Sequence, residues 1–306
     1  MPSTKTPAEL PPTNGATTLW LRLPGNFRGI LWLSMGAFLF AVVDVFVKSL
    51  GGRFDPLQIS FFRYGCGLIF LLPVFLRLGV SNLKTKRMPL HLLRMFLAFA
   101  AQLGIFITVI YMPLAEATAF MFSKPLFTTV VAVFLLHEVV VRQRWAATVV
   151  GFIGVLVLVR PGAEVFDSLA LVAIGAALTF AIANVLIRKL STTEPTGRIL
   201  FYYHIGGVLL FVGPAAYFWT MPIGIEWLKL ISIGGLTTLG IFGFMRAFAV
   251  GEANAVGPAE NVRLIYAALF GYFLFAEIPS VWTGVGALII VSSTYYIAQV
   301  EARKQS

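Results

Sequence analysis

The sequence FAVVDVFVKSL at positions 40–50 decides the fold, because a second copy of it, FAIANVLIRKL, occurs at positions 180–190. The two copies match Asp44 to Asn184. Further along each half, AEATA matches GEANA, and FLLHEVV matches FLFAEIP. Matches that recur in the same order indicate that the chain consists of two copies of one structural unit.

The composition is that of a membrane protein. The chain of 306 residues is 58% hydrophobic and 12% charged, with a mean hydropathy of +0.88. A soluble domain of this size cannot bury so much apolar surface, so we expect a lipid bilayer around the protein. The net charge of +10 does not indicate a nucleic-acid partner, because the basic residues collect in short segments between apolar runs. Cys66 is the only cysteine, which excludes an intrachain disulfide.

Ten apolar runs are each long enough to cross a bilayer, which takes roughly 20 residues. They lie at 27–48, 56–78, 90–111, 115–136, 144–160, 168–188, 198–219, 227–249, 254–276 and 279–300. Each half of the chain holds five runs, and because five is odd, the second half inserts upside down relative to the first. We therefore predict an all-α membrane protein with ten transmembrane helices in an inverted five-plus-five repeat. Its expected parts are a disordered tail at 1–26, repeats at 27–162 and 163–300, and a tail at 301–306.

The basic residues predict the orientation. With the N-terminus in the cytoplasm, sixteen Lys and Arg side chains fall on the cytoplasmic side and four on the outer side. This asymmetry follows the positive-inside rule, so we expect both termini to be cytoplasmic and the protein to lie in the cell inner (plasma) membrane. The first 26 residues lack the charged and apolar regions of a signal peptide.

Two cations lie within the apolar runs at matching positions. The run FMFSKPLFTTVV places Lys124 about 14 Å into the bilayer, near its centre. Lys124 precedes Glu138 by fourteen residues, and Arg263 precedes Glu277 by the same number. A charge at a helix centre costs about 2.5–3.5 kcal/mol on insertion scales. We therefore predict that both cations face a shared aqueous cavity. Pro125 is expected to kink the helix there.

A structural charge network is the alternative interpretation. Glu260 lies three residues before Arg263 and could neutralise it, and Asp44 could neutralise Lys124 or Arg63. Arg63 either holds a carboxylate or phosphate of a substrate or extends to the outer interface. Asp44 either titrates in a proton-coupled cycle or pairs with Lys48, one helical turn later.

The remaining candidates are uncharged or lie at helix ends. Asn184 offers hydrogen bonds to a substrate or to a neighbouring helix. Tyr64 and Tyr266 either stack on a planar ligand or pack between helices. Glu138 and Glu277 are interpreted as boundary or gate residues.

The sequence lacks the motifs of ATP binding, of metal binding and of nucleophilic catalysis. There is no phosphate-binding glycine loop, the three histidines have no metal-ligand spacing, and no Ser or Cys nucleophile accompanies a nearby base. We therefore expect no cofactor, no metal and no enzyme activity.

The segment PLAEATAFMFSKPLFTTVVAVFLLHEVVVRQRWAATVVGFIGVLVLVRPG resembles the repeat of the EamA-type drug/metabolite transporters, and the resemblance covers roughly residues 27–300 in two copies. It implies ten helices, a central cavity and two cytoplasmic ends. DVFVKSLGGRFDPLQISFFRY is most similar to the branch that takes up S-adenosylmethionine, which implies roles for Asp44, Lys48, Arg63 and Tyr64. The chain differs in the order of Glu260 and Arg263 and in having Lys124 before the proline. The added cation favours a carboxylate, a phosphate or a zwitterion.

The leading hypothesis is a secondary carrier of a small polar metabolite, namely an amino-acid-like zwitterion, S-adenosylmethionine or an organic anion. An exporter of amphipathic drugs or cations is the alternative within transport. A non-transporting membrane scaffold is the alternative outside it, and an intramembrane enzyme is a remote one. The pattern leaves the direction of transport, proton coupling and the oligomeric state open.

Overall fold

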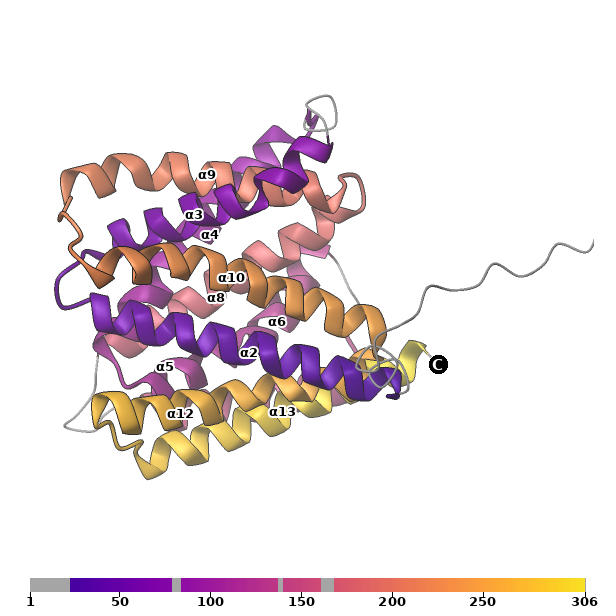
Figure 1. The fold of residues 1–306 in the computed structure, drawn as a ribbon. Coiled ribbons are helices and arrows are strands. Elements are labelled where there is room, and N and C mark those ends of the chain that lie inside the picture. The colour runs from indigo at the N-terminus through magenta and orange to yellow at the C-terminus, as the bar shows by residue number, and fades with distance from the viewer. Residues whose placement is uncertain (1–22, 79–83, 137–139, 161–167, 306) are drawn as a thin grey trace, which may run out of the picture.

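The computed structural model describes residues 23–78, 84–136, 140–160 and 168–305. Helices make up nearly all of the described residues, and no strand occurs among them (Figure 1). The elements are α2 (Gly25–Leu50), α3 (Pro56–Leu78), α4 (Met88–Tyr111), α5 (Leu114–Met121), α6 (Lys124–Leu136), α7 (Arg142–Val159), α8 (Leu169–Ser191), α9 (Thr196–Tyr217), α10 (Ile225–Val250), α11 (Ala253–Val256), the 3-10 helix η2 (Gly257–Asn261), α12 (Val262–Phe275) and α13 (Val281–Gln305).

The predicted fold class is confirmed. Nine helical stretches of the described chain, with α5 and α6 counted together, are long and apolar enough to cross a membrane. The tenth crossing is made of α11, η2 and α12, none of which is long enough alone. Most predicted ends agree within a few residues; the first run, expected at 27–48, is Gly25–Leu50. The tail expected at 301–306 is mostly helical, because α13 continues to Gln305.

Two crossings are interrupted, one in each half of the chain. The fourth ends as α5 at Met121 and resumes as α6 at Lys124. Pro125 therefore lies in the first turn of α6, where its missing N–H would have had no helical partner. The sequence predicted a kink at this proline, and the structure interrupts the helix over two residues, Phe122 and Ser123, just before it. In the ninth crossing the interruption is η2, immediately before α12.

Helix packing repeats itself between the halves. The most extensive helix contacts pair α2 with α10, α4 with α8, α7 with α13 and α3 with α9. The first two pairs are equivalent under the sequence repeat, which also matches the glycines of LGIF at 103–106 and 239–242. A Cβ on Gly36 would lie 3.0 Å from the carbonyl oxygen of Gly240, and one on Gly104 would lie 2.8 Å from the Cβ of Ala176. Small residues thus bring the equivalent pairs together, as in other membrane bundles.

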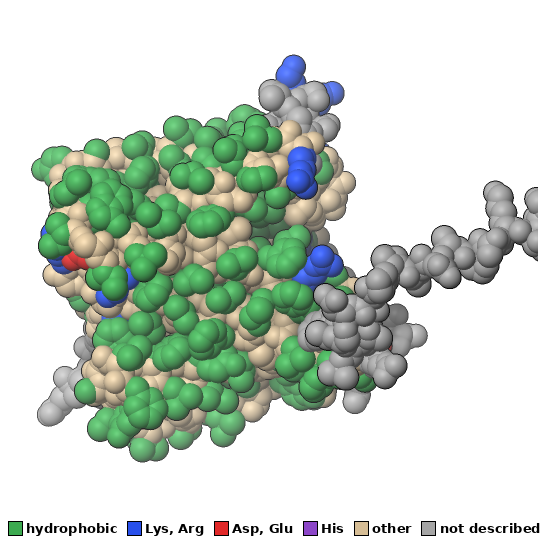
Figure 2. Space-filling view, viewed as in Figure 1, with side chains coloured by type: hydrophobic (Ala, Val, Ile, Leu, Met, Phe, Trp, Pro, Cys, Tyr) green, Lys and Arg blue, Asp and Glu red, His purple; other side chains and the backbone are tan. Residues whose placement is uncertain are grey.

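The surface is that of a multi-pass membrane protein. Apolar side chains cover the middle of the face shown in Figure 2, and basic side chains lie toward the two ends. Leu209 is 65% exposed and Phe134 is 73% exposed, which is favourable in lipid and costly in water. The two ends are named here by a residue at each. The Glu277 end is where α2, α4, α9 and α12 finish, at the left in Figure 1, and the Glu194 end is where α3, α8 and α10 finish.

Candidate functional site

The first charged group of the site joins the two halves of the chain. Nη2 of Arg263, in the first turn of α12, donates to Oδ2 of Asp44 on α2 at 2.7 Å. The side chains are 15% and 7% exposed, so the pair is largely shielded from water. The guanidinium also lies over the ring of Phe40, 5.4 Å from its centroid. Phe40 and Asp44 are one helical turn apart, so one face of α2 holds the whole cation.

The second group has the same layout with one difference. Lys124 begins α6, and its Nζ lies over the ring of Phe180 on α8, 4.6 Å from the centroid. Asn184 is one turn beyond Phe180, where the first group has its aspartate. Among the described residues, Lys124 forms no ion pair, and its Nζ forms no hydrogen bond; the side chain is half-buried.

Four charges lie close together at this site. The charged groups that act on Lys124 are Glu260, Arg263 and Asp44. Arg263 pairs with Asp44, not with Glu260 as the structural alternative had it. Glu260, in η2, is half-buried and forms no ion pair with another described residue. Within the described part of the chain, Lys124 and Glu260 are therefore the two of these four charges that form no ion pair.

Arg63 and Tyr64 lie in a separate cluster between α3 and α9. Nη1 of Arg63 donates to the hydroxyl of Tyr203 at 3.2 Å, and its guanidinium lies 4.9 Å from the ring centroid of Tyr64. The hydroxyls of Tyr64 and Tyr203 are 3.3 Å apart. Arg63 is thus held inside the protein rather than extended to an interface. Arg94 stacks on the other side of this group, 5.0 Å from the ring centroid of Tyr203.

Two predicted candidates, Tyr266 and Asn184, form no hydrogen bond with the charged groups among the described residues. Tyr266 packs edge-on against Phe38, with ring centroids 5.4 Å apart, and Phe38 lies on the exposed surface of α2. The side chain of Asn184 forms no hydrogen bond with another described residue, and it lies on α8 one helical turn after Phe180, whose ring is under Nζ of Lys124. Arg94 was not singled out from the sequence, where it counts only as one more basic residue near a helix end.

An ion pair ties three segments together at the Glu277 end. Nζ of Lys48 lies 2.6 Å from Oε1 of Glu277 and donates to the carbonyl of Met112 at 2.5 Å. Oε2 of the same carboxylate accepts from the backbone N–H of Leu114 at 2.8 Å. Lys48 therefore pairs with Glu277 and not with Asp44. Glu138, the predicted counterpart of Glu277, lies outside the described residues.

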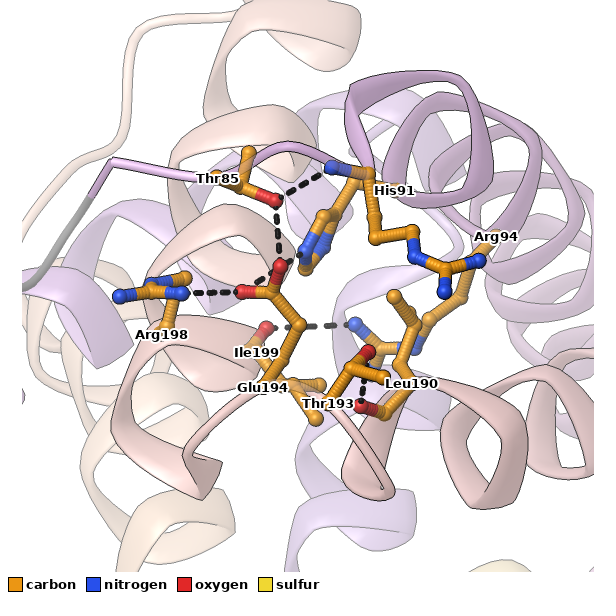
Figure 3. Close-up of polar contacts among 9 residues, drawn as sticks. Thr85, His91, Arg94, Leu190, Thr193, Glu194, Arg198 and Ile199 are labelled. Atoms are coloured by element: carbon orange, nitrogen blue, oxygen red, sulfur yellow. Dashed lines mark hydrogen bonds and ion pairs between the residues drawn. The ribbon is translucent and has the colours of Figure 1, made fainter.

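A second network lies at the Glu194 end (Figure 3). Glu194 accepts from Oγ1 of Thr85 at 2.6 Å and from Nη1 of Arg198 at 2.7 Å, and Nε2 of His91 lies 3.8 Å from it. Arg94 instead donates to the carbonyl of Ile199 at 3.3 Å. Burial alone would raise the pKa of Glu194, but the hydrogen bonds from Thr85 and Arg198 outweigh it and lower this pKa. The network connects the α3–α4 and α8–α9 links.

In the described part of the chain, no three His, Cys, Asp or Glu side chains lie close enough to hold a metal ion.

Known proteins resemble the chain over nearly its whole length. The model of the EamA-like transporter family matches residues 27–160 and again 168–299. An S-adenosylmethionine uptake transporter of Rickettsia felis is 34% identical over 91% of this chain and 95% of its own. A riboflavin transporter of Vibrio cholerae is 31% identical over 90% of this chain and 95% of its own. A solved crystal structure, 19% identical, covers 96% of this chain and 100% of its own with a TM-score of 0.60, and it shares the fold.

Proposed function

Because the chain belongs to the EamA-like transporter family, we propose that it is a secondary active transporter of a small zwitterionic metabolite. Its two repeats, 27–162 and 163–300, would alternate in exposing a central site to either side of the membrane. The proposed setting is the cell inner membrane, with both termini cytoplasmic.

One observation carries this proposal. Both repeats interrupt a membrane crossing and place a cation directly after the break, Lys124 in one and Arg263 in the other. Broken helices at the repeat interface are where transporters of this type bind their substrates. Lys124 and Glu260 lack direct partners among the described residues, so a zwitterion supplies an anion to one and a cation to the other.

S-adenosylmethionine is the first candidate substrate. Its carboxylate suits Lys124 and its ammonium suits Glu260, while its sulfonium adds one positive charge that these two groups do not balance. Relatives named for its uptake support the choice. A relative named for riboflavin makes a flavin the competing candidate. Proton coupling through Asp44 is also proposed, because protonation of this carboxylate would release Arg263.

The test is ligand-dependent thermal stability of the purified protein. A ligand that binds only the folded state raises the unfolding midpoint by mass action. We expect S-adenosylmethionine to raise it in wild type and in Lys189→Gln, an exposed lysine on α8, but not in Lys124→Gln. Uptake of the labelled compound into proteoliposomes should show the same ranking.

Each other outcome has a definite meaning. Stabilisation by riboflavin alone would replace the substrate and keep the carrier. Stabilisation by amphipathic cations alone would favour a drug exporter. A failure of every ligand, together with no uptake, would leave the scaffold as the better description.

A further inference from the structure

The two repeats build the same local arrangement around a cation, and the first copy is complete. In it, the ring of Phe40 lies under the guanidinium of Arg263, and Asp44 closes the arrangement with a hydrogen bond of 2.7 Å. The cation is thus held by an aromatic face and by a carboxylate one helical turn further along the same helix. A buried cation with both kinds of contact is electrostatically balanced.

The second copy lacks the carboxylate. Phe180 corresponds to Phe40 in the sequence repeat and lies under Nζ of Lys124. The residue one turn further along is Asn184, an uncharged amide of the same shape as aspartate. No other described carboxylate forms an ion pair with Lys124. This copy therefore lacks the negative charge that Asp44 supplies in the other copy, and the equivalent position is that of Asn184.

We propose that a carboxylate of the transported metabolite binds between Lys124 and Asn184, where Asp44 lies in the other repeat. Lys124 supplies the charge, and the amide of Asn184 donates a hydrogen bond that an aspartate at this position would be unable to give. The proposal rests on the proposed transport function and specifies which chemical group the central site recognises.

Glu260 does not take the place of this carboxylate. It lies in η2 and is an electrostatic neighbour of Lys124, but it does not come within ion-pair distance of a described residue. It is therefore free to face the positively charged part of the same molecule. A compound with its carboxylate at Lys124 and its ammonium toward Glu260 places an opposite charge at each of these two groups.

The substrates for which the relatives are named differ in whether they carry a carboxylate. S-adenosylmethionine has a carboxylate that fits the vacant position, whereas riboflavin has none. Decarboxylated S-adenosylmethionine differs from the parent compound only in that group, which makes the two a matched pair of probes. Propionate tests the subsite alone, because it has no other recognisable part.

The decisive variant is Asn184→Asp, which supplies the missing carboxylate from the protein itself. The side chain keeps its size and gains a charge opposite Lys124. We expect the unfolding midpoint of the variant to rise by about 2 °C or more, and its binding of S-adenosylmethionine to weaken by about ten- to a hundredfold. Asn26→Asp, which adds the same charge at the start of α2, is the matched control and should bind as wild type does.

Thermal shift and direct binding are measured for wild type, Asn184→Asp, Asn26→Asp and Lys124→Gln, with each probe at equal ionic strength. The proposal predicts that wild type prefers S-adenosylmethionine over its decarboxylated form by about tenfold or more. It also predicts that propionate stabilises wild type and Asn26→Asp only. Equal binding of both probes, a lowered midpoint of Asn184→Asp, or unchanged binding by that variant would each overturn it.

Different results would contradict the proposed transport function and the proposed carboxylate subsite. Stabilisation by propionate that is lost in Asn184→Asp, with no uptake of any compound into proteoliposomes, would support the subsite and contradict transport. Uptake of S-adenosylmethionine that Asn184→Asp leaves unchanged would support transport and contradict the subsite.

Discussion

Arg263 and Asp44 meet at 2.7 Å although 219 residues separate them in the chain. The pair bridges the two repeats inside the membrane-spanning bundle, where water does not replace a lost partner. The stability of the protein should therefore depend on both members together.

Removing one member of this pair should destabilise the protein more than removing both. Asp44→Asn leaves the Arg263 guanidinium without a counter-charge, and breaking a buried pair in this way typically costs about 3–5 kcal/mol. The double variant Asp44→Asn with Arg263→Gln should regain much of that loss. The measurement is the free energy of unfolding, or the thermal midpoint, of all four proteins. Additive losses would contradict a direct interaction.

The ion pair at the Glu277 end should contribute more than an exposed pair at the same end. Glu277→Gln removes the partner of Lys48, whose side chain is 12% exposed, and weakens the acceptor of Leu114 N–H. We expect a loss of about 3 kcal/mol. Glu226→Gln breaks the pair with Arg53, which is 41% exposed, and should change stability by less than about 1 kcal/mol.

Hydrogen exchange at Met112 and Leu114 provides a second readout of Glu277→Gln. If the pair holds the α4–α5 link in place, the backbone amides of that link should exchange faster in the variant. Unchanged exchange, with Glu226→Gln as the reference, would contradict this role.

A methyl group on Gly207 should disturb the tyrosine cluster. A Cβ there would lie 2.3 Å from a ring carbon of Tyr64, so the ring must move. We expect Gly207→Ala to cost about 1–3 kcal/mol. Gly213→Ala on the same helix meets nothing within 4 Å and should be neutral or stabilising by about 0.5–1 kcal/mol. Equal effects of the two substitutions on the unfolding midpoint would contradict the packing that the structure shows.

The Glu194 network should make stability fall in acid. The pKa of Glu194 is lower in the folded protein than its ordinary value, because the hydrogen bonds from Thr85 and Arg198 outweigh burial. Its contribution is therefore complete above the ordinary glutamate pKa and is lost as the pH falls through the folded value. Glu194→Gln should lose about 1–3 kcal/mol at neutral pH and differ less from wild type in acid.

The measurement is the unfolding midpoint of each protein as the pH is lowered from neutral to about 3.5, which is below the ordinary glutamate pKa. The matched control is Glu252→Gln, an exposed acid at the same end of the bundle, which should follow the wild-type curve. A gap between Glu194→Gln and wild type that stays constant with pH would contradict the assignment.

The helices and their repeat could be predicted from the sequence because lipid exposure and burial both require apolar side chains over about 20 residues. The equivalence of Lys124 and Arg263 followed from spacing alone, and the structure places both cations directly after a helix break. The breaks themselves were not predicted, since Pro125 is compatible with a kink as well as with a new first turn.

The partners of the charges were harder to predict than their positions. The sequence offered Asp44 three candidate partners, Lys124, Arg63 and Lys48, and the observed partner Arg263 was not among them. The packing of α2 on α12 brings Arg263 to Asp44. The same holds for Glu194, which follows α8 and meets Thr85 more than a hundred residues away. No local pattern encodes such contacts, because they depend on how the helices are arranged in three dimensions.

The matched positions 44 and 184 also have a genetic consequence. Codons for aspartate and asparagine differ by a single base, so one point mutation in either copy adds or removes a charge in the central site. The two side chains have nearly the same shape, and such a mutation leaves the packing of α2 and α8 largely as it is. An inverted duplication of this kind thus allows the charge preference of a carrier to change in one evolutionary step.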